Sequence, residues 1–158
     1  MPITPEQLPE SASPIVIIDD DPDDQFFIRR GISRGGILHP IKAFPDGTEA
    51  VTYFAQRREA ENPDTPACVI FCDIKMPRMN GIEVLRWFRG NAAWAGVSFY
   101  MLSGSNEPAD RALAESLGAT GYFVKFPTDA EFAHIIAPAV QTLRSARPEP
   151  QLEGRADG

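Results

Sequence analysis

Residues 67–81 read Ala-Cys-Val-Ile-Phe-Cys-Asp-Ile-Lys-Met-Pro-Arg-Met-Asn-Gly and join an apolar run to a carboxylate and a loop of defined shape. The run has the length and composition of a strand buried on both faces, and Asp73 stands at its carboxyl end. Pro77 and Gly81 favour a fixed turn before a following helix. The stretch therefore predicts a parallel strand that delivers Asp73 to the edge where such sheets bind ligands.

Three other short apolar runs also end on side chains that carry chemistry. The run IVII precedes Asp19 and Asp20, FYML precedes Ser103, and GYFV precedes Lys125. Because parallel strands end at one edge of a sheet, we expect these groups to meet Asp73 there. An acidic cluster, a hydroxyl and an ammonium suit Mg²⁺ beside a phosphoryl group.

Strand and helix signals alternate along the chain, which predicts an α/β fold with a doubly wound, five-stranded parallel sheet. Strands are expected over 15–19, 41–45, 67–73, 97–103 and 121–125. Helices are expected over 22–33, 46–61, 81–90, 106–118 and 128–144. We expect one domain over 14–144, flanked by flexible tails at 1–13 and 145–158 that are poor in apolar residues.

The composition argues against several classes of partner. The 158 residues carry a net charge of −7, so we expect neither nucleic acid nor an anionic membrane surface to bind. There is no apolar run of spanning length and no secretory signal, which predicts a cytoplasmic protein. Cys68 and Cys72 lack partners spaced for zinc and are expected to be small buried side chains. His39 and His134 are assigned no role.

The segment 19–24 is unusually acidic, with five aspartates and one proline. Part of it has a structural explanation, because Asp21 can cap the next helix and proline suits its first turn. Asp23 and Asp24 are then favoured by the positive end of the helix dipole. These residues are therefore interpreted as a helix start rather than as a site.

Asp19 and Asp20 lie before that cap and are expected to face Asp73. Three converging carboxylates repel one another and should raise at least one pKa unless a cation lies among them. A hard cation with oxygen ligands, such as Mg²⁺, resolves the conflict.

Taken in order, these residues resemble the receiver domains of two-component response regulators, which have a flavodoxin-like fold. The resemblance covers about residues 14–144 and has four parts: Asp19-Asp20 as the acidic pair, 73–81 as the phosphoacceptor loop, Ser103-Gly104 as the switch hydroxyl and its small neighbour, and Tyr122-Phe-Val-Lys125 as the aromatic switch and the lysine. The run Asp-Pro-Asp-Asp at 21–24 further resembles a stand-alone subgroup that serves phytochrome-type and other sensor kinases.

This resemblance implies phosphotransfer. Asp73 would be the phosphoacceptor, attacking a phosphohistidine on a sensor histidine kinase or a histidine phosphotransfer protein. Mg²⁺ would be held by Asp20, Asp73 and the backbone carbonyl of Lys75, with Asp19 acting through water. Lys125 would supply a second positive charge. The chain would transfer and slowly lose its phosphoryl group without turning over a metabolite.

The resemblance also implies the form of the output. Ser103 would donate its hydroxyl to the phosphoryl group, and Tyr122 would turn in behind it. A receiver without an attached output module would then act by docking, on a phosphorelay partner or a downstream protein target. The apolar stripe between Phe132 and Leu143 could form core or a homodimer interface.

Two departures from the family pattern stand out. The family has proline directly after the lysine, often with a cis bond between them, whereas here Phe126 intervenes before Pro127. The cis bond is therefore expected to move to Phe126-Pro127 or to vanish, because a cis bond before a non-proline residue costs roughly 3 kcal/mol. Lys75, two residues after Asp73, is expected to shield a phosphoryl group from hydrolysis.

Two alternatives from other classes remain open. Asp19-x-Asp21, Ser103 and Lys125 imitate the ordered motifs of haloacid-dehalogenase-type phosphohydrolases, but that family's hydroxyl after the aspartates and its late acidic ligands are absent. The second alternative is an interaction module that is never phosphorylated. The intact set of acidic residues, hydroxyl and lysine disfavours it.

Overall fold

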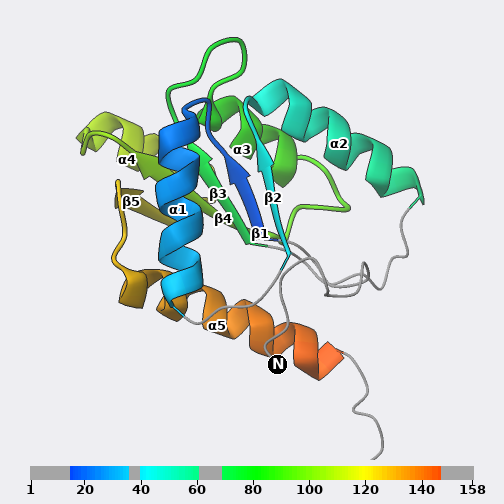
Figure 1. The fold of residues 1–158 in the computed structure, drawn as a ribbon. Coiled ribbons are helices and arrows are strands. Elements are labelled where there is room, and N and C mark those ends of the chain that lie inside the picture. The colour runs from blue at the N-terminus through cyan, green and yellow to red at the C-terminus, as the bar shows by residue number, and fades with distance from the viewer. Residues whose placement is uncertain (1–14, 36–39, 61–68, 147–158) are drawn as a thin grey trace, which may run out of the picture.

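A single parallel sheet organises the chain, and the computed structural model describes residues 15–35, 40–60 and 69–146 of it (Figure 1). Its strands lie in the order β2-β1-β3-β4-β5. The strands are β1 (Ile15–Ile18), β2 (Ile41–Phe44), β3 (Val69–Asp73), β4 (Ser98–Ser103) and β5 (Gly121–Val124). This is the flavodoxin-like order, so the predicted doubly wound fold is confirmed.

Helices cover both faces of the sheet. They are α1 (Pro22–Arg34), α2 (Gly47–Ala60), α3 (Gly81–Arg89), α4 (Pro108–Ser116) and α5 (Asp129–Ala146). One apolar cluster joins α1 and α5 to the sheet, and a second cluster joins α2, α3 and α4 to its other face. Figure 1 shows α1 in front of the strands and α5 running below them. All ten elements lie close to their predicted ranges.

The central strands β1, β3 and β4 are largely apolar because both of their faces are covered. In β1, Ile15 and Ile17 belong to the cluster under α1 and α5, whereas Val16 and Ile18 belong to the opposite cluster. The strand β2 lies at the edge and is only half-buried. The continuous apolar runs of β1 and β3 therefore mark strands in the interior of the sheet.

The loop after β3 is held at the start of α3. Asn80 caps this helix by accepting a hydrogen bond from the N–H of Glu83, whose side chain accepts one from the N–H of Asn80 in return. Gly81 passes so close to the strand that a Cβ there would lie 2.2 Å from the carbonyl oxygen of Asp73. Any other residue at 81 would displace the loop from the end of β3.

The last helix contributes to the core. Phe132, Ile135 and Ile136 are buried against the sheet, so this part of the apolar stripe is core rather than interface. The Phe132 ring packs edge-on against Phe71, with 5.4 Å between the ring centroids.

Several predictions concern residues outside the described ranges. These are the tail at 1–13, most of the tail at 145–158, and the side chains of Cys68 and His39. Cys72 is fully buried, as expected, and burial raises the pKa of its thiol well above its usual value. No helix in the described part of the chain has the length and apolar character needed to cross a membrane.

Candidate functional site

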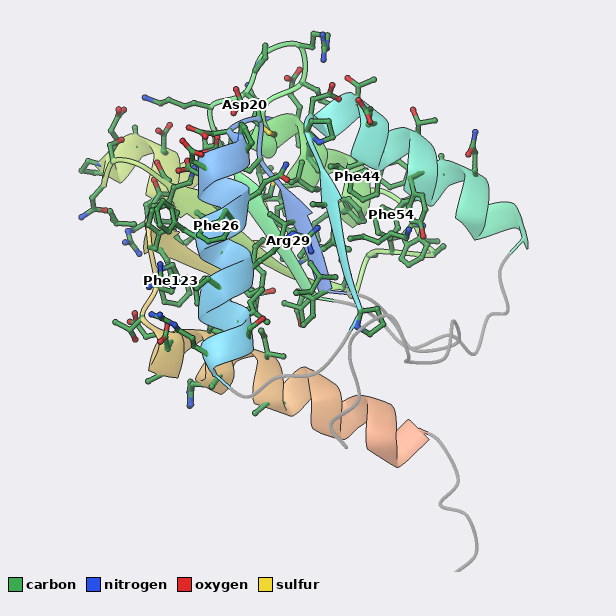
Figure 2. All side chains as sticks on the ribbon, viewed as in Figure 1. Asp20, Phe26, Arg29, Phe44, Phe54 and Phe123 are labelled. Atoms are coloured by element: carbon green, nitrogen blue, oxygen red, sulfur yellow. The ribbon has the colours of Figure 1, made fainter. Side chains whose placement is uncertain are left out.

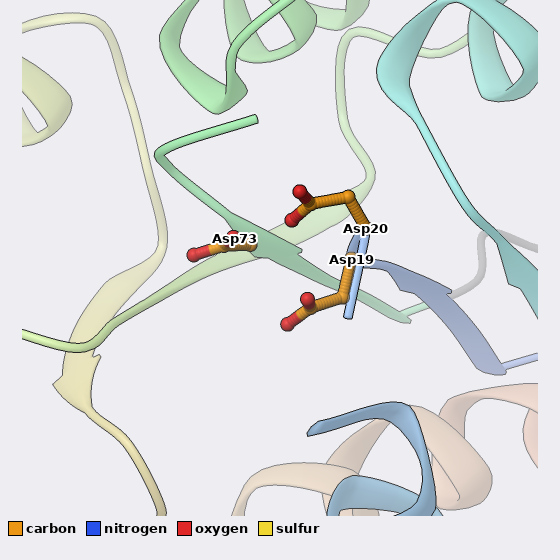
Figure 3. Close-up of side chains that lie close together, drawn as sticks. All are labelled: Asp19, Asp20 and Asp73. Atoms are coloured by element: carbon orange, nitrogen blue, oxygen red, sulfur yellow. The ribbon is translucent and has the colours of Figure 1, made fainter. Parts of the chain in front are cut away.

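An acidic cluster lies where the chain order of the sheet reverses. From β1 the sheet extends to β2 on one side and to β3 on the other, and ligands bind to such sheets at this switch point. Asp19 and Asp20 follow β1, and Asp73 ends β3. One carboxylate oxygen from each lies within 4.8 Å of the others (Figure 3). Asp19 and Asp73 are buried, whereas Asp20 is exposed.

Lys125, directly after β5, brings a positive charge to the cluster. Its Nζ lies 2.7 Å from Asp19 Oδ2 and 3.4 Å from Asp73 Oδ1, and its side chain is 9% exposed. The same Nζ lies 2.6 Å from Asp24 Oδ2, in the first turn of α1. The structure thus brings Lys125 to the predicted place, and it adds a partner that the sequence had not indicated.

Negative charge exceeds positive charge at this edge. Burial and the charge of Asp19 raise the pKa of Asp73 to about 6. Burial also raises the pKa of Asp19, and the adjacent ammonium offsets this only in part. Burial acts to lower the pKa of Lys125, but its contacts with Asp19 and Asp24 and the charge of Asp73 outweigh burial and hold that pKa above its usual value.

The cluster has the donor set that a hard divalent cation requires. Among the described residues, Asp19 Oδ2 is a buried oxygen that accepts no well-aligned hydrogen bond. It forms an ion pair with Lys125 Nζ. Asp20 adds an exposed carboxylate, and Asp73 adds one whose pKa is raised by burial and by the charge of Asp19. Carboxylate oxygens at this spacing suit Mg²⁺ or a similar ion, which would also relieve the repulsion.

The predicted switch residues lie beside this edge. Ser103 ends β4, is buried, and accepts a hydrogen bond from the N–H of Ser105 at 3.2 Å. Tyr122 is buried in β5, and its hydroxyl donates to the Ser105 carbonyl oxygen at 3.1 Å. The Arg111 guanidinium lies over the tyrosine ring at 4.6 Å from its centroid. The tyrosine is therefore already packed inward in this structure.

Lys75 extends from the loop after β3 to the start of α4. Its Nζ lies 3.0 Å from Glu107 Oε1, and both side chains are exposed. Further along the same loop Arg78, with a positive φ of 67°, forms an ion pair with the buried carboxylate of Asp46 before α2. The loop is thus connected to the starts of two helices.

The expectation for the cis bond was wrong. The cis peptide joins Lys125 to Phe126 and not Phe126 to Pro127. The expectation rested on the lower cost of a cis bond before proline. Tertiary packing overrides that local preference: Pro127 is buried, and the Phe126 ring packs against Phe27 with 5.5 Å between centroids.

Exposed aromatic rings adjoin the lysine. Phe26 and Phe27 on α1 are 58% and 44% exposed, and Phe126 is 40% exposed. Figure 2 shows Phe26 on the face of α1 directed away from the sheet. Because Phe126 follows Lys125 directly, this apolar surface continues to the edge of the site.

Fold and site together define a flavodoxin-like protein with an acidic triad and a lysine at its switch point. The family model of the response regulator receiver domain matches residues 15–137. The chain therefore belongs to the response regulator receiver domain family.

Two relatives match most of the chain. The chain is 32% identical over 111 residues to a probable cyclic di-GMP phosphodiesterase of Vibrio cholerae, covering 70% of this chain and 23% of that protein. It is 28% identical over 142 residues to the response regulator MprA of Mycobacterium tuberculosis, covering 90% of this chain and 55% of MprA. The chain thus spans less than two thirds of these relatives.

Solved structures include similar proteins. The bacteriophytochrome response regulator AtBRR superimposes with a TM-score of 0.64 at 25% identity, over 92% of this chain and 100% of that one.

Proposed function

We propose that this receiver accepts a phosphoryl group on Asp73 in a Mg²⁺-dependent reaction and signals through changed binding to other proteins. The observation that carries the proposal is the convergence of Asp73 with two further carboxylates and the Lys125 ammonium at the switch point. This arrangement pairs a nucleophile with positive charge at the place where phosphoryl oxygens would lie.

The chain's own residues account for each part of the transfer. An Asp73 oxygen attacks phosphorus, and the bond from phosphorus to the donor histidine nitrogen breaks, with the electron pair leaving on nitrogen. The Lys125 ammonium donates to a phosphoryl oxygen. Asp20, Asp73 and the Lys75 carbonyl would hold Mg²⁺, with Asp19 acting through water, and the ion would neutralise phosphoryl charge when bound.

The output rests on the two switch residues. A phosphoryl oxygen would accept a hydrogen bond from the Ser103 hydroxyl. This would change the position of the segment from Ser103 to Ser105. The Tyr122 hydroxyl donates a hydrogen bond to the Ser105 carbonyl oxygen, so a movement of this segment would also shift the tyrosine and the start of α4. The changed surface would alter binding to a partner.

The proposed donor is a sensor histidine kinase or a histidine phosphotransfer protein. The likeness to AtBRR favours a phytochrome-type kinase. The donor histidine must approach Asp73 at the carboxyl ends of the strands. The exposed rings of Phe26, Phe27 and Phe126 lie beside this edge. A homodimer and the downstream target stay predictions.

Incubation with acetyl phosphate tests the proposal. The parent chain is expected to gain the mass of one phosphoryl group in the presence of Mg²⁺ and to gain nothing when the metal is chelated. The adduct should be cleaved by hydroxylamine, because it is an acyl phosphate. Intact-protein mass spectrometry measures both.

Other outcomes would support the alternatives. Catalytic release of orthophosphate from small phosphate esters, with no adduct, would favour the phosphohydrolase. Absence of both adduct and turnover, with the protein shown to be folded, would favour the interaction module that is never phosphorylated.

We also predict that Lys75 sets the lifetime of the phosphorylated state. Lys75→Ala is expected to lose its phosphoryl group about fivefold faster than the parent, equal to about 1 kcal/mol of barrier, because the hydrolytic water enters more freely. The decay of the phosphorylated mass after removal of acetyl phosphate measures this.

The ion pair with Glu107 supplies a matched control. Glu107→Gln frees the Lys75 ammonium and should slow the decay if that ammonium shields the phosphoryl group. A Lys75→Ala variant that decays no faster than the parent would contradict the prediction.

A further inference from the structure

Asp24 holds the lysine of the site although it does not belong to the acidic triad. Its Oδ2 lies 2.6 Å from Lys125 Nζ, and their side chains are 25% and 9% exposed. A charge-assisted hydrogen bond this short and this shielded from water is stronger than a surface ion pair. The contact links the first turn of α1 to the end of β5.

The proposed reaction requires the same ammonium elsewhere. Lys125 Nζ lies 3.4 Å from Asp73 Oδ1, farther than from Asp24. Its protons must serve Asp19, Asp24 and any phosphoryl group joined to Asp73. A carboxylate at Asp24 therefore occupies one of the three ammonium protons, offsets part of the ammonium charge and adds a negative charge close to an incoming anion.

We propose that Asp24 is a positioning residue that retains the Lys125 ammonium in the unphosphorylated state and so weakens its pairing with a phosphoryl group on Asp73. The inference rests on the function proposed above, because it requires a phosphoryl group at that place. Asp24 would set how readily the receiver enters and keeps its phosphorylated form.

The test removes the charge of Asp24 and keeps its shape. Asp24→Asn is expected to bind beryllofluoride, an anionic phosphoryl analogue, about fivefold more tightly than the parent at saturating Mg²⁺, the scale of one partly buried ion pair. The variant without ligand should unfold at a lower temperature, since it has lost that pair. Isothermal titration calorimetry and thermal unfolding measure the two effects.

Asp23→Asn is the matched control. It makes the same change in net charge one residue away, at an exposed position in the same turn. Titration of each variant with Mg²⁺ alone keeps a change in metal affinity separate from a change in analogue affinity. Asp24→Glu, which keeps the charge, should bind the analogue more like the parent than Asp24→Asn does.

The outcomes separate this inference from the proposed function. Tighter binding by Asp24→Asn than by Asp23→Asn supports it. Equal or weaker binding overturns it, and a lower unfolding temperature with unchanged affinity would show that the ion pair is only structural. If the parent itself binds no beryllofluoride and gains no phosphoryl group, the proposed function fails and this inference with it.

Discussion

The Asp73→Asn variant is expected to gain no phosphoryl mass from acetyl phosphate and Mg²⁺ under conditions in which the parent is expected to gain one group. An uncharged amide is a far poorer nucleophile than a carboxylate, and loss of the attacking group typically costs on the order of a thousandfold or more in rate. The variant should remain folded, because asparagine fills the same volume and removes one charge from a crowded cluster. Intact mass and thermal unfolding measure the two properties together.

The control for this experiment is Asp23→Asn, an identical substitution at an exposed position on α1. It is expected to take up one phosphoryl group as the parent does. A full mass gain by Asp73→Asn would contradict the prediction and would move the phosphoacceptor to another carboxylate of the cluster, Asp19 or Asp20.

Much of the site could be predicted from sequence because strand ends are local features. Each of β1, β3, β4 and β5 is an apolar run whose next or last residue is polar, and parallel pairing carries those residues to one edge. Asp19, Asp73 and Lys125 needed no knowledge of side-chain direction to be placed together. The flavodoxin-like fold followed from the same alternation of strands and helices.

The partners of individual side chains were not predictable in this way. Asp24 was interpreted as a helix-dipole residue, and it does lie in the first turn of α1, but its carboxylate also contacts Lys125, 101 residues further along the chain. The sequence signal for this contact was the position of Asp24, four residues after Asp20. Side chains on a helix tilt toward its N-terminus, which here lies at the end of β1. The Lys75–Glu107 pair likewise joins two loops whose separation depends on packing.

The second large effect concerns stability. Phe88→Ala on α3 is expected to reduce the free energy of unfolding by about 3–5 kcal/mol, because it removes a large buried side chain and leaves a cavity. Phe88 is fully buried, and its ring packs against Phe54 and Phe99 at centroid distances of 5.1 and 5.6 Å. Domains of this size are typically stable by roughly 5–15 kcal/mol, so much of the total would be lost. Urea denaturation measures the change.

Phe26→Ala supplies the control, since it deletes the same atoms from a side chain that is 58% exposed. It is expected to lower the free energy of unfolding by less than about 1 kcal/mol, because the side chain buries little apolar area and its removal leaves no cavity. The denaturant midpoint of Phe88→Ala should fall with an unchanged slope, which would show lost packing within a two-state transition. Equal costs at the two positions would mean that α3 does not pack against the sheet through Phe88, and the same helix anchors the Asp73 loop through the hydrogen bond from the Gly81 N–H to the Ile74 carbonyl oxygen.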